Sequence, residues 1–303
     1  MNVKVVQTKG LYHTVKNVSG ALDRSSKEWY KETPKEKSSM DGIQSCTFIT
    51  SLVVQFVVLI ISLATLGHEG TPPILQLALV LETVIQGIEF AWYVIVGVLV
   101  YFRKESINVS SRYIDWVFTT PVMLSTLLLL LIWSDPLNEC RLVEDAVSDI
   151  ESFWYVIFAL VICDWVMLLV GWLIEASPRN VFTDPPDSAK KRWSRGARQL
   201  VLLIGFVPLV IGFSMYPYVA NEELNIPGWS IALVAITFVL WIFYGLVAIV
   251  FEGKERKQQQ YRNAFYNILD IFSKNVAGLV VSIIALNTDP CPADLGSGEV
   301  GSG

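Results

Sequence analysis

Seven long apolar segments alternate with polar loops along the chain. They cover about residues 46–66, 74–102, 111–133, 153–175, 199–220, 228–251 and 264–287. A helix of roughly 20 apolar residues spans the hydrocarbon core of a bilayer and satisfies its own backbone hydrogen bonds there. The pattern therefore predicts an all-α membrane protein, a seven-transmembrane-helix bundle within residues 46–288. A polar N-terminal segment (1–45) precedes this bundle, and a flexible Gly/Ser-rich tail (289–303) follows it.

Composition supports a membrane protein and argues against other classes. Of the 303 residues, 53% are hydrophobic and 17% are charged, and the mean hydropathy of +0.48 is above the usual range of a soluble domain. The N-terminal segment lacks the apolar core of a secretory signal peptide, so the first span is expected to act as its own signal. The expected partner is the lipid bilayer, with no nucleic acid and no enzymatic activity.

The cysteines do not form a recognisable framework. Cys46, Cys140, Cys163 and Cys291 lie far apart on different segments, whereas disulfide scaffolds and metal sites bring cysteines together at short, repeated spacings. We expect unpaired cysteines and no metal site.

Loop charges bear on the orientation in the membrane. The N-terminal segment and the loops after the fourth and sixth spans are basic and share one side of the predicted bundle, whereas the loops on the other side are acidic. The positive-inside rule then predicts a cytoplasmic N-terminus.

Few ionisable residues lie inside the spans, and such residues are expensive enough that a functional role is the default interpretation. They are Glu82 and Glu89 in span two, Arg112 and Asp115 in span three, Asp164 in span four, and Asp270 and Lys274 in span seven.

In span seven, Asp270 and Lys274 are four residues apart and share a helical face. A lysine buried in hydrocarbon loses its proton unless a carboxylate pairs with it, and the neutral amine is the form that condenses with an aldehyde. A purely structural ion pair explains this segment equally well. Span three separates the two hypotheses, because Arg112, Asp115 and Thr119 also share one face and offer a second carboxylate. Pro121 in the same span is tolerated if Ser/Thr groups or water bind the carbonyl it frees.

Together these two segments resemble the microbial rhodopsins, which carry Arg-x-x-Asp-Trp-x-x-Thr-x-Pro in the third helix and Asp-x-x-x-Lys in the seventh. The resemblance implies that Lys274 binds all-trans-retinal as a Schiff base, with Asp115 and Asp270 as counterions and Arg112 ordering the extracellular half. It also implies a set of pocket residues and a contact between Asp164 and Thr120. That pocket set comprises Trp116, Thr119, Thr120, Met123, Asp164, Met167, Gly171 and Trp241. Span six departs from the family pattern, because no proline accompanies its aromatic residues Phe238 and Trp241.

Within the family, the sequences of spans one, two and seven are most similar to those of channelrhodopsins. An asparagine, Asn275, directly follows the lysine, and Glu82 precedes the tripeptide Ile88-Glu89-Phe90. The resemblance implies a light-gated ion channel with a pathway along Gln55, Ser62, Glu82, Glu89 and Asn275. Ser62, Glu89 and Asn275 are expected to form a hydrogen-bonded central gate.

Two other functions remain open. A light-driven proton pump needs Asp115 and Thr119, but it usually has a carboxylate about two turns further on, where this chain has Thr126. A photosensor without transport needs an output domain or a transducer surface, and neither is recognisable. For a channel, Val96 and Val100 stand where cation channels continue their row of glutamates, which favours anions over protons or other monovalent cations.

The resemblance also implies a plasma-membrane protein with an extracellular N-terminus, against the loop charges, and a homo-oligomer is expected. Asn17 and Asn108 begin glycosylation sequences that are usable only if that side is extracellular.

Overall fold

The computed structural model describes residues 42–103, 109–135, 151, 153–176, 195–222, 226–251 and 256–288. Within them, helices α2 (Gly42–Leu66), α3 (Pro73–Arg103), α4 (Val109–Trp133), α6 (Trp154–Ala176), α7 (Arg195–Glu222) and α8 (Gly228–Val250) form the first six spans. The seventh combines α9 (Arg256–Asp270), the π-helix η1 (Ile271–Asn275) and α10 (Val276–Asn287). The predicted all-α fold with seven apolar spans is therefore confirmed.

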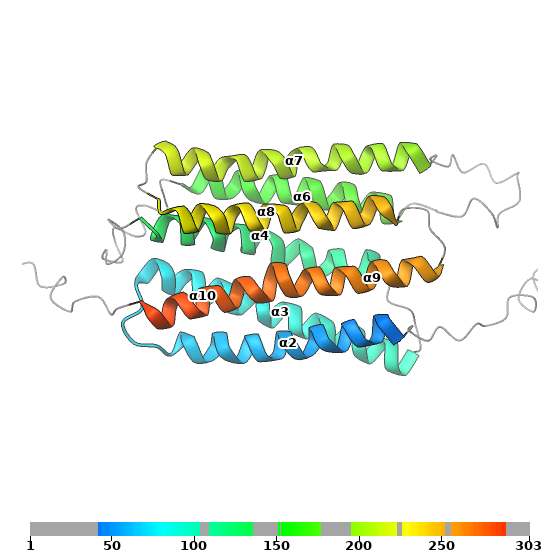
Figure 1. Cartoon of the computed structure of the whole chain (residues 1–303), viewed down its shortest axis with the longest axis horizontal. Helices are drawn as coiled ribbons and strands as arrows, with labels where there is room; N and C mark the ends of the chain where they lie inside the picture. Colours follow the sequence, from blue (N-terminus) through cyan, green and yellow to red (C-terminus); the bar gives the residue numbers. More distant parts are fainter. Residues whose placement is uncertain are drawn as a thin grey trace, which may run out of the picture.

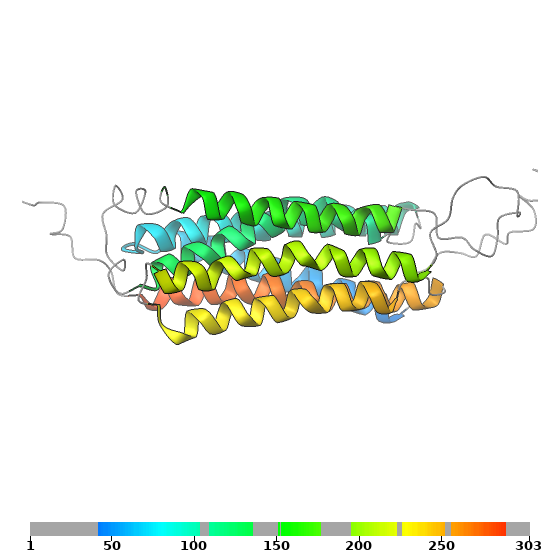
Figure 2. The ribbon, with the colours of Figure 1, turned by 90° about the horizontal axis from the view of Figure 1, so that it is seen from above.

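The spans run side by side along one axis and form a closed bundle (Figures 1 and 2). Successive helices pack against each other, and the seventh span returns to α2 and α3, which closes the ring. Helix α4 lies furthest inside: 78% of its spanning segment is buried, against 22–44% in the other six. The seventh span and α4 therefore bring their polar residues into the middle of the bundle.

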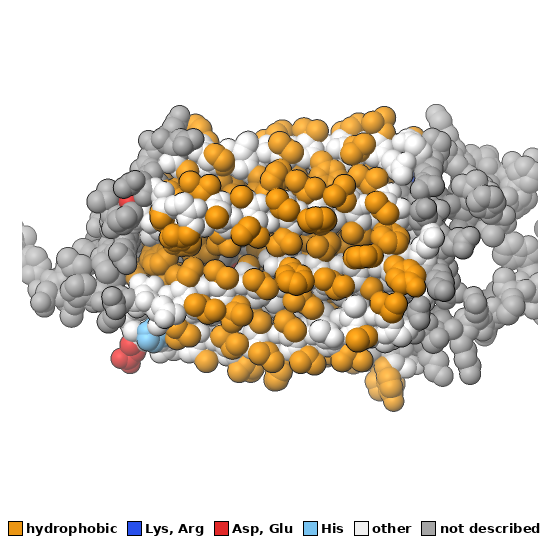
Figure 3. Space-filling model, viewed as in Figure 1, with side chains coloured by type: hydrophobic (Ala, Val, Ile, Leu, Met, Phe, Trp, Pro, Cys, Tyr) orange, Lys and Arg blue, Asp and Glu red, His pale blue; other side chains and the backbone are white. Residues whose placement is uncertain are grey.

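The outer surface is apolar, as expected for a face in contact with lipid (Figure 3). Exposed side chains there include Val53, Phe158, Ile204 and Val239. The inner face of α2 is different, because most of its buried residues are polar. They are Gln44, Ser51, Gln55, Ser62 and Thr65, together with Phe48 and Val58. A membrane helix with a polar inner face places hydrogen-bonding groups where they are costly unless they serve a pathway.

Two predicted features fall partly outside the described residues. Cys46 and Cys163 form no disulfide within the described part of the chain, while Cys140, Cys291, Asn17 and Asn108 lie outside it. The basic N-terminal segment also lies outside it.

Candidate functional site: a buried lysine at the end of a cavity

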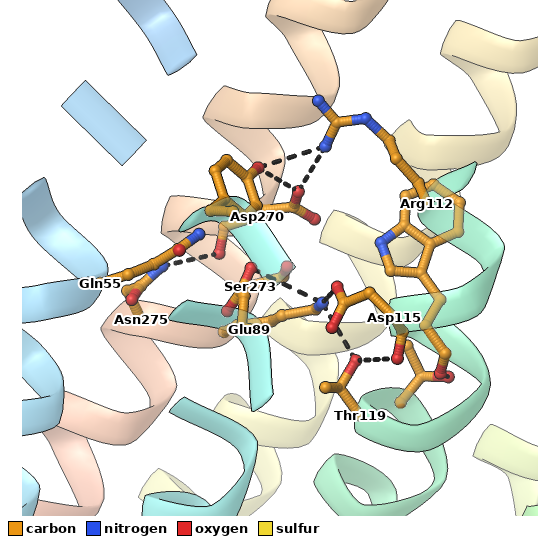
Figure 4. A network of polar contacts seen from close by, with 12 residues as sticks. Gln55, Glu89, Arg112, Asp115, Thr119, Asp270, Ser273 and Asn275 are labelled. Atoms are coloured by element: carbon orange, nitrogen blue, oxygen red, sulfur yellow. Dashed lines mark hydrogen bonds and ion pairs between the residues drawn. The ribbon is translucent and has the colours of Figure 1, made fainter. Parts of the chain in front are cut away.

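Lys274 lies on η1 in the centre of the bundle with only 2% of its surface exposed. Its Nζ donates hydrogen bonds to Asp115 Oδ2 at 2.9 Å and to Thr119 Oγ1 at 3.1 Å. Glu89 Oε1 on α3 is 3.6 Å from the same nitrogen. Asp115, Thr119 and Glu89 lie together in the middle of Figure 4. Two carboxylates thus surround one buried cation, which is the arrangement that a charge inside a membrane protein requires.

Helix α4 presents Asp115 and Thr119 to the lysine because the two residues are four apart on one helical face. Pro121 follows within the same helix and has no N–H to bind the carbonyl of Val117. The indole Nε1 of Trp165 on α6 donates to that carbonyl at 3.1 Å. The partner of this carbonyl is therefore a tryptophan of the neighbouring span rather than the expected Ser/Thr group.

Asp270 has different partners from those expected. Its Oδ2 accepts hydrogen bonds from Arg112 and from Tyr93 Oη, both at 2.8 Å, and its Oδ1 accepts one from Tyr244 Oη at 2.7 Å. Arg112, Tyr93 and Tyr244 therefore supply three hydrogen bonds to the carboxylate of Asp270. Among the described residues, the carboxylates in direct ion pairs with Lys274 are Asp115 and Glu89, so Asp270 does not contact the amine directly and its role as a counterion stays a prediction.

Arg112 extends this network across the half of the bundle that contains the start of α2. Its other nitrogen donates to the side chain of Asn267 and, at 3.4 Å, to the carbonyl of Asn263. Asn267 in turn donates to Thr47 Oγ1 on α2 at 3.1 Å. One guanidinium thus links α2, α3, α4 and α9 in this half. That Arg112 orders the extracellular half stays a prediction.

Lys274 also borders a largely apolar cavity. Six of the predicted pocket residues line it, and these are Trp116, Thr120, Met123, Met167, Gly171 and Trp241. These six residues come from three spans that are far apart in the sequence, and Lys274 adds a fourth. Trp241 is among them, although its span departs from the family pattern.

Several cavity residues were not predicted, chiefly the aromatic Tyr113, Phe206, Tyr244 and Tyr266. Two glycines explain how such large rings fit. A Cβ at Gly171 would lie 2.6 Å from Tyr113 Oη, and a Cβ at Gly245 would lie 1.4 Å from the ring of Phe206. Gly245 follows Tyr244 in span six, so a small residue there creates the space that Phe206 fills. In the sequence, the position of Tyr244 one helical turn after Trp241 could have indicated that Tyr244 also faces the cavity.

The predicted contact between Asp164 and Thr120 is present. Thr120 Oγ1 bonds to Asp164 Oδ2 at 2.8 Å and to the carbonyl of Trp116 at 2.7 Å. This joins α4 to α6 beside the cavity.

The predicted gate residues do not bond to one another as expected. Ser62 Oγ contacts Ser282 Oγ at 3.4 Å, and Asn275 donates to the carbonyl of Asp270 at 3.4 Å. Glu89 is a neighbour of Lys274 instead, and neither of its oxygens has a hydrogen-bond partner among the described residues. The hydrogen-bonded triad is therefore corrected, and Glu89 belongs to the cluster around the amine. Gln55 and Asn275 project from α2 and η1 into the interior beside this cluster (Figure 4).

Residues 43–288 match the sequence model of a family described as bacteriorhodopsin-like proteins. The opsin-like protein carO of Fusarium fujikuroi is 24% identical over 180 residues, which are 59% of this chain and 49% of that protein. The chain therefore spans about half the length of the curated relatives it matches.

Solved structures show the same fold at low identity. A viral rhodopsin, OLPVRII, superposes with a TM-score of 0.58 at 20% identity and covers 81% of this chain and 98% of its own. The proton pumping rhodopsin AR2 from the marine alga Acetabularia acetabulum has a TM-score of 0.57 at 17% identity, over 82% of this chain and 96% of its own. The thermophilic rhodopsin from Rubrobacter xylanophilus has a TM-score of 0.56 at 22% identity, over 84% of this chain and all of its own.

Proposed function

The chain belongs to the family of bacteriorhodopsin-like proteins, the microbial rhodopsins, and from that premise we propose that it is a light-gated ion channel with all-trans-retinal bound to Lys274. One observation supports the attachment site above all others. The side chain of Lys274 borders an apolar cavity, and its amine lies 2.9 Å from the carboxylate of Asp115. Bound retinal supplies visible absorption and a light-driven change of shape.

The residues around the amine then have definite tasks. Asp115 and Thr119 hold a proton at the lysine nitrogen, and Glu89 supplies the second negative charge. Trp116 and Trp241 form aromatic walls of the cavity. Oδ1 of Asp115 has no hydrogen-bond partner among the described residues, so it is available to a further donor in the site. The apolar lining excludes bulk water from the attachment point.

The channel part of the proposal rests on the buried polar side chains between α2, α3 and the seventh span. Gln55, Ser62, Glu82, Glu89 and Asn275 are each at most 1% exposed. Polar groups at this depth are expected to mark an ion or proton path. A change in the position of Lys274 disturbs groups along this whole path, which lets water enter.

Among ions, we favour anions over cations. Val96 and Val100 on α3 pack against the cluster of Phe48 and Tyr93, so α3 adds no carboxylate at these two positions. Fewer carboxylates weaken the attraction for cations.

The reversal potential tests the channel. In retinal-supplied cells expressing the chain, we expect a light-induced current that changes sign near the equilibrium potential of the permeant ion. Lowering external chloride tenfold, by substituting a large anion for it, should move that potential by about 59 mV, the value for a tenfold concentration change of a singly charged species. A sodium gradient serves as the control and should have little effect for an anion channel. A current of constant direction at all voltages contradicts passive conduction.

A proton pump is the second candidate. The direct hydrogen bond from Lys274 to Asp115 favours it, because the carboxylate of Asp115 is placed to accept the lysine proton. Thr126, however, occupies the position expected for an internal proton donor, and its hydroxyl bonds to the carbonyl of Val122. Return of the proton would therefore be slow. A unidirectional current that is insensitive to chloride and sodium would select the pump, and a pigment without current would select a photosensor.

Glu89 should affect colour as well as conduction. Its carboxylate is 3.6 Å from Lys274 Nζ, where an attraction of about 5 kcal/mol is expected at an effective dielectric constant of about 20. Glu89→Gln is therefore expected to shift absorption to longer wavelength. Glu82→Gln is the matched control, because Glu82 bonds to Gln86 rather than to the amine. Equal spectra for the two variants would contradict the placement of Glu89.

A further inference from the structure

Gln86 joins the main chain of Lys274 to Glu82, and neither the family motifs nor the pathway prediction singled it out. Its Nε2 donates to the Lys274 carbonyl at 3.2 Å and to Glu82 Oε1 at 3.0 Å. An amide nitrogen carries two hydrogens, so both are used, one for each acceptor. Gln86 and Glu82 are four residues apart on α3, which places both side chains on the same face toward the seventh span.

This Lys274–Gln86–Glu82 bridge is shielded from solvent. Gln86 is 0% and Glu82 1% exposed. The remaining side-chain oxygens, Gln86 Oε1 and Glu82 Oε2, make no hydrogen bond to the described residues. The orientation of the amide is therefore set by its two donated bonds. In a buried site, losing either bond leaves a donor unsatisfied and favours a rotation of the side chain.

Gly278 provides an independent sign that the structure makes room for this bridge. It lies one turn after Lys274 on α10, where an added Cβ would be 2.8 Å from both Gln86 Nε2 and Glu82 Oε1. The backbone conformation here is helical, so glycine is not needed for a special φ angle. Glycine is needed because the bridge occupies the space of a side chain.

Lys274 also lies within the π-helix η1. Such turns interrupt the regular α-helical hydrogen-bond series and are often found at functional sites. A wider, irregular turn gives the carbonyl of this residue more freedom to move than it would have in a continuous α-helix.

We propose that Gln86 is a positioning residue that transmits movement of the Lys274 main chain to the carboxyl group of Glu82. When the lysine shifts after illumination, its carbonyl moves relative to Gln86 Nε2. The amide then turns to recover a partner, and the bond to Glu82 changes with it. Glu82 lies on the α10 side of the lysine, away from Arg112, so this bridge links the attachment point to the half of the pathway that contains Ser62 and Ser282. The inference rests on the proposed attachment of retinal to Lys274 but not on ion conduction.

Light-minus-dark infrared difference spectroscopy on the full chain in lipid, supplied with all-trans-retinal, tests the bridge. The signal of Glu82 is identified in the carboxyl and carboxylate regions as the feature lost in Glu82→Gln. In Gln86→Met, which keeps the length of the side chain but removes the donor, we expect loss of the Glu82 signal while the visible band and the retinal signals remain. Gly278→Ala, which crowds the bridge without removing a polar group, should shift or abolish the same signal.

Gln44→Leu is the matched control, because Gln44 is a buried glutamine at the start of α2, remote from the bridge. It should leave the Glu82 signal unchanged. An unchanged Glu82 signal in both Gln86→Met and Gly278→Ala would overturn the proposal, as would a wild-type pigment without any Glu82 signal. If Gln86→Met yields no pigment, Gly278→Ala decides the question. A wild-type protein without visible absorption would instead count against retinal at Lys274.

Discussion

We expect the Lys274→Ala variant, supplied with all-trans-retinal, to have no visible absorption band. The amine of Lys274, which borders the cavity, is the attachment point for retinal in our proposal, and alanine has no side-chain nitrogen. Removing the lysine also leaves Asp115 and Glu89 without their shared cation. Breaking a buried ion pair in this way costs about 3–5 kcal/mol, so lower thermal stability should accompany the loss of colour. Absorption spectroscopy and thermal unfolding of the purified protein measure the two effects.

Loss of colour through misfolding must be separated from loss of the attachment point. A preformed imine of retinal with a small alkylamine can fill the cavity without a bond to the chain. If the cavity is intact, this imine should restore a visible band in Lys274→Ala. A Lys274→Ala protein that is coloured with retinal alone, without the imine, would end the assignment.

The second large effect is expected from Asp115→Asn, which should shift the visible band to longer wavelength. Asp115 Oδ2 is the nearest carboxylate oxygen to Lys274 Nζ, at 2.9 Å, and its attraction is about 6 kcal/mol at an effective dielectric constant of about 20. This charge stabilises a positive charge localised at the nitrogen before excitation. Without it, the charge spreads more easily and excitation needs less energy. The shift should exceed that of Glu89→Gln, because Glu89 is further away.

Asp164→Asn is the control for the change of a carboxyl to an amide. Asp164 is also buried, but it bonds to Thr120 instead of the lysine. We expect a much smaller shift from it. Equal shifts in Asp115→Asn and Asp164→Asn, or no shift in either, would show that Asp115 is not the principal counterion.

Much of this architecture could be read from the order of residues alone. A bilayer requires each span to be long, apolar and helical, so the hydrophobic pattern predicted all seven spans before any contact was known. The spacing of Arg112, Asp115 and Thr119 predicted a shared helical face, and the structure turns Asp115 and Thr119 of that face to Lys274. The contact of Thr120 with Asp164 and the cavity position of Trp241 were expected from the resemblance to the microbial rhodopsins.

The partners of the buried charges could not be predicted in this way. Asp270 is four residues from Lys274, but Arg112, Tyr93 and Tyr244 approach it from three other helices. Glu89 was expected in a gate and instead lies beside the amine.

Local spacing determines which side of a helix a residue occupies. The sequence by itself therefore determined the seven spans, their inward polar faces and the place of the lysine in the last span. The tertiary structure alone decided which inward groups meet, because that depends on the rotation and depth of each helix against its neighbours. Trp165 reaches the carbonyl freed by Pro121, and Gly278 leaves the space in which Gln86 bridges Lys274 and Glu82. Such contacts join residues far apart in the chain, so no periodicity within one span encodes them.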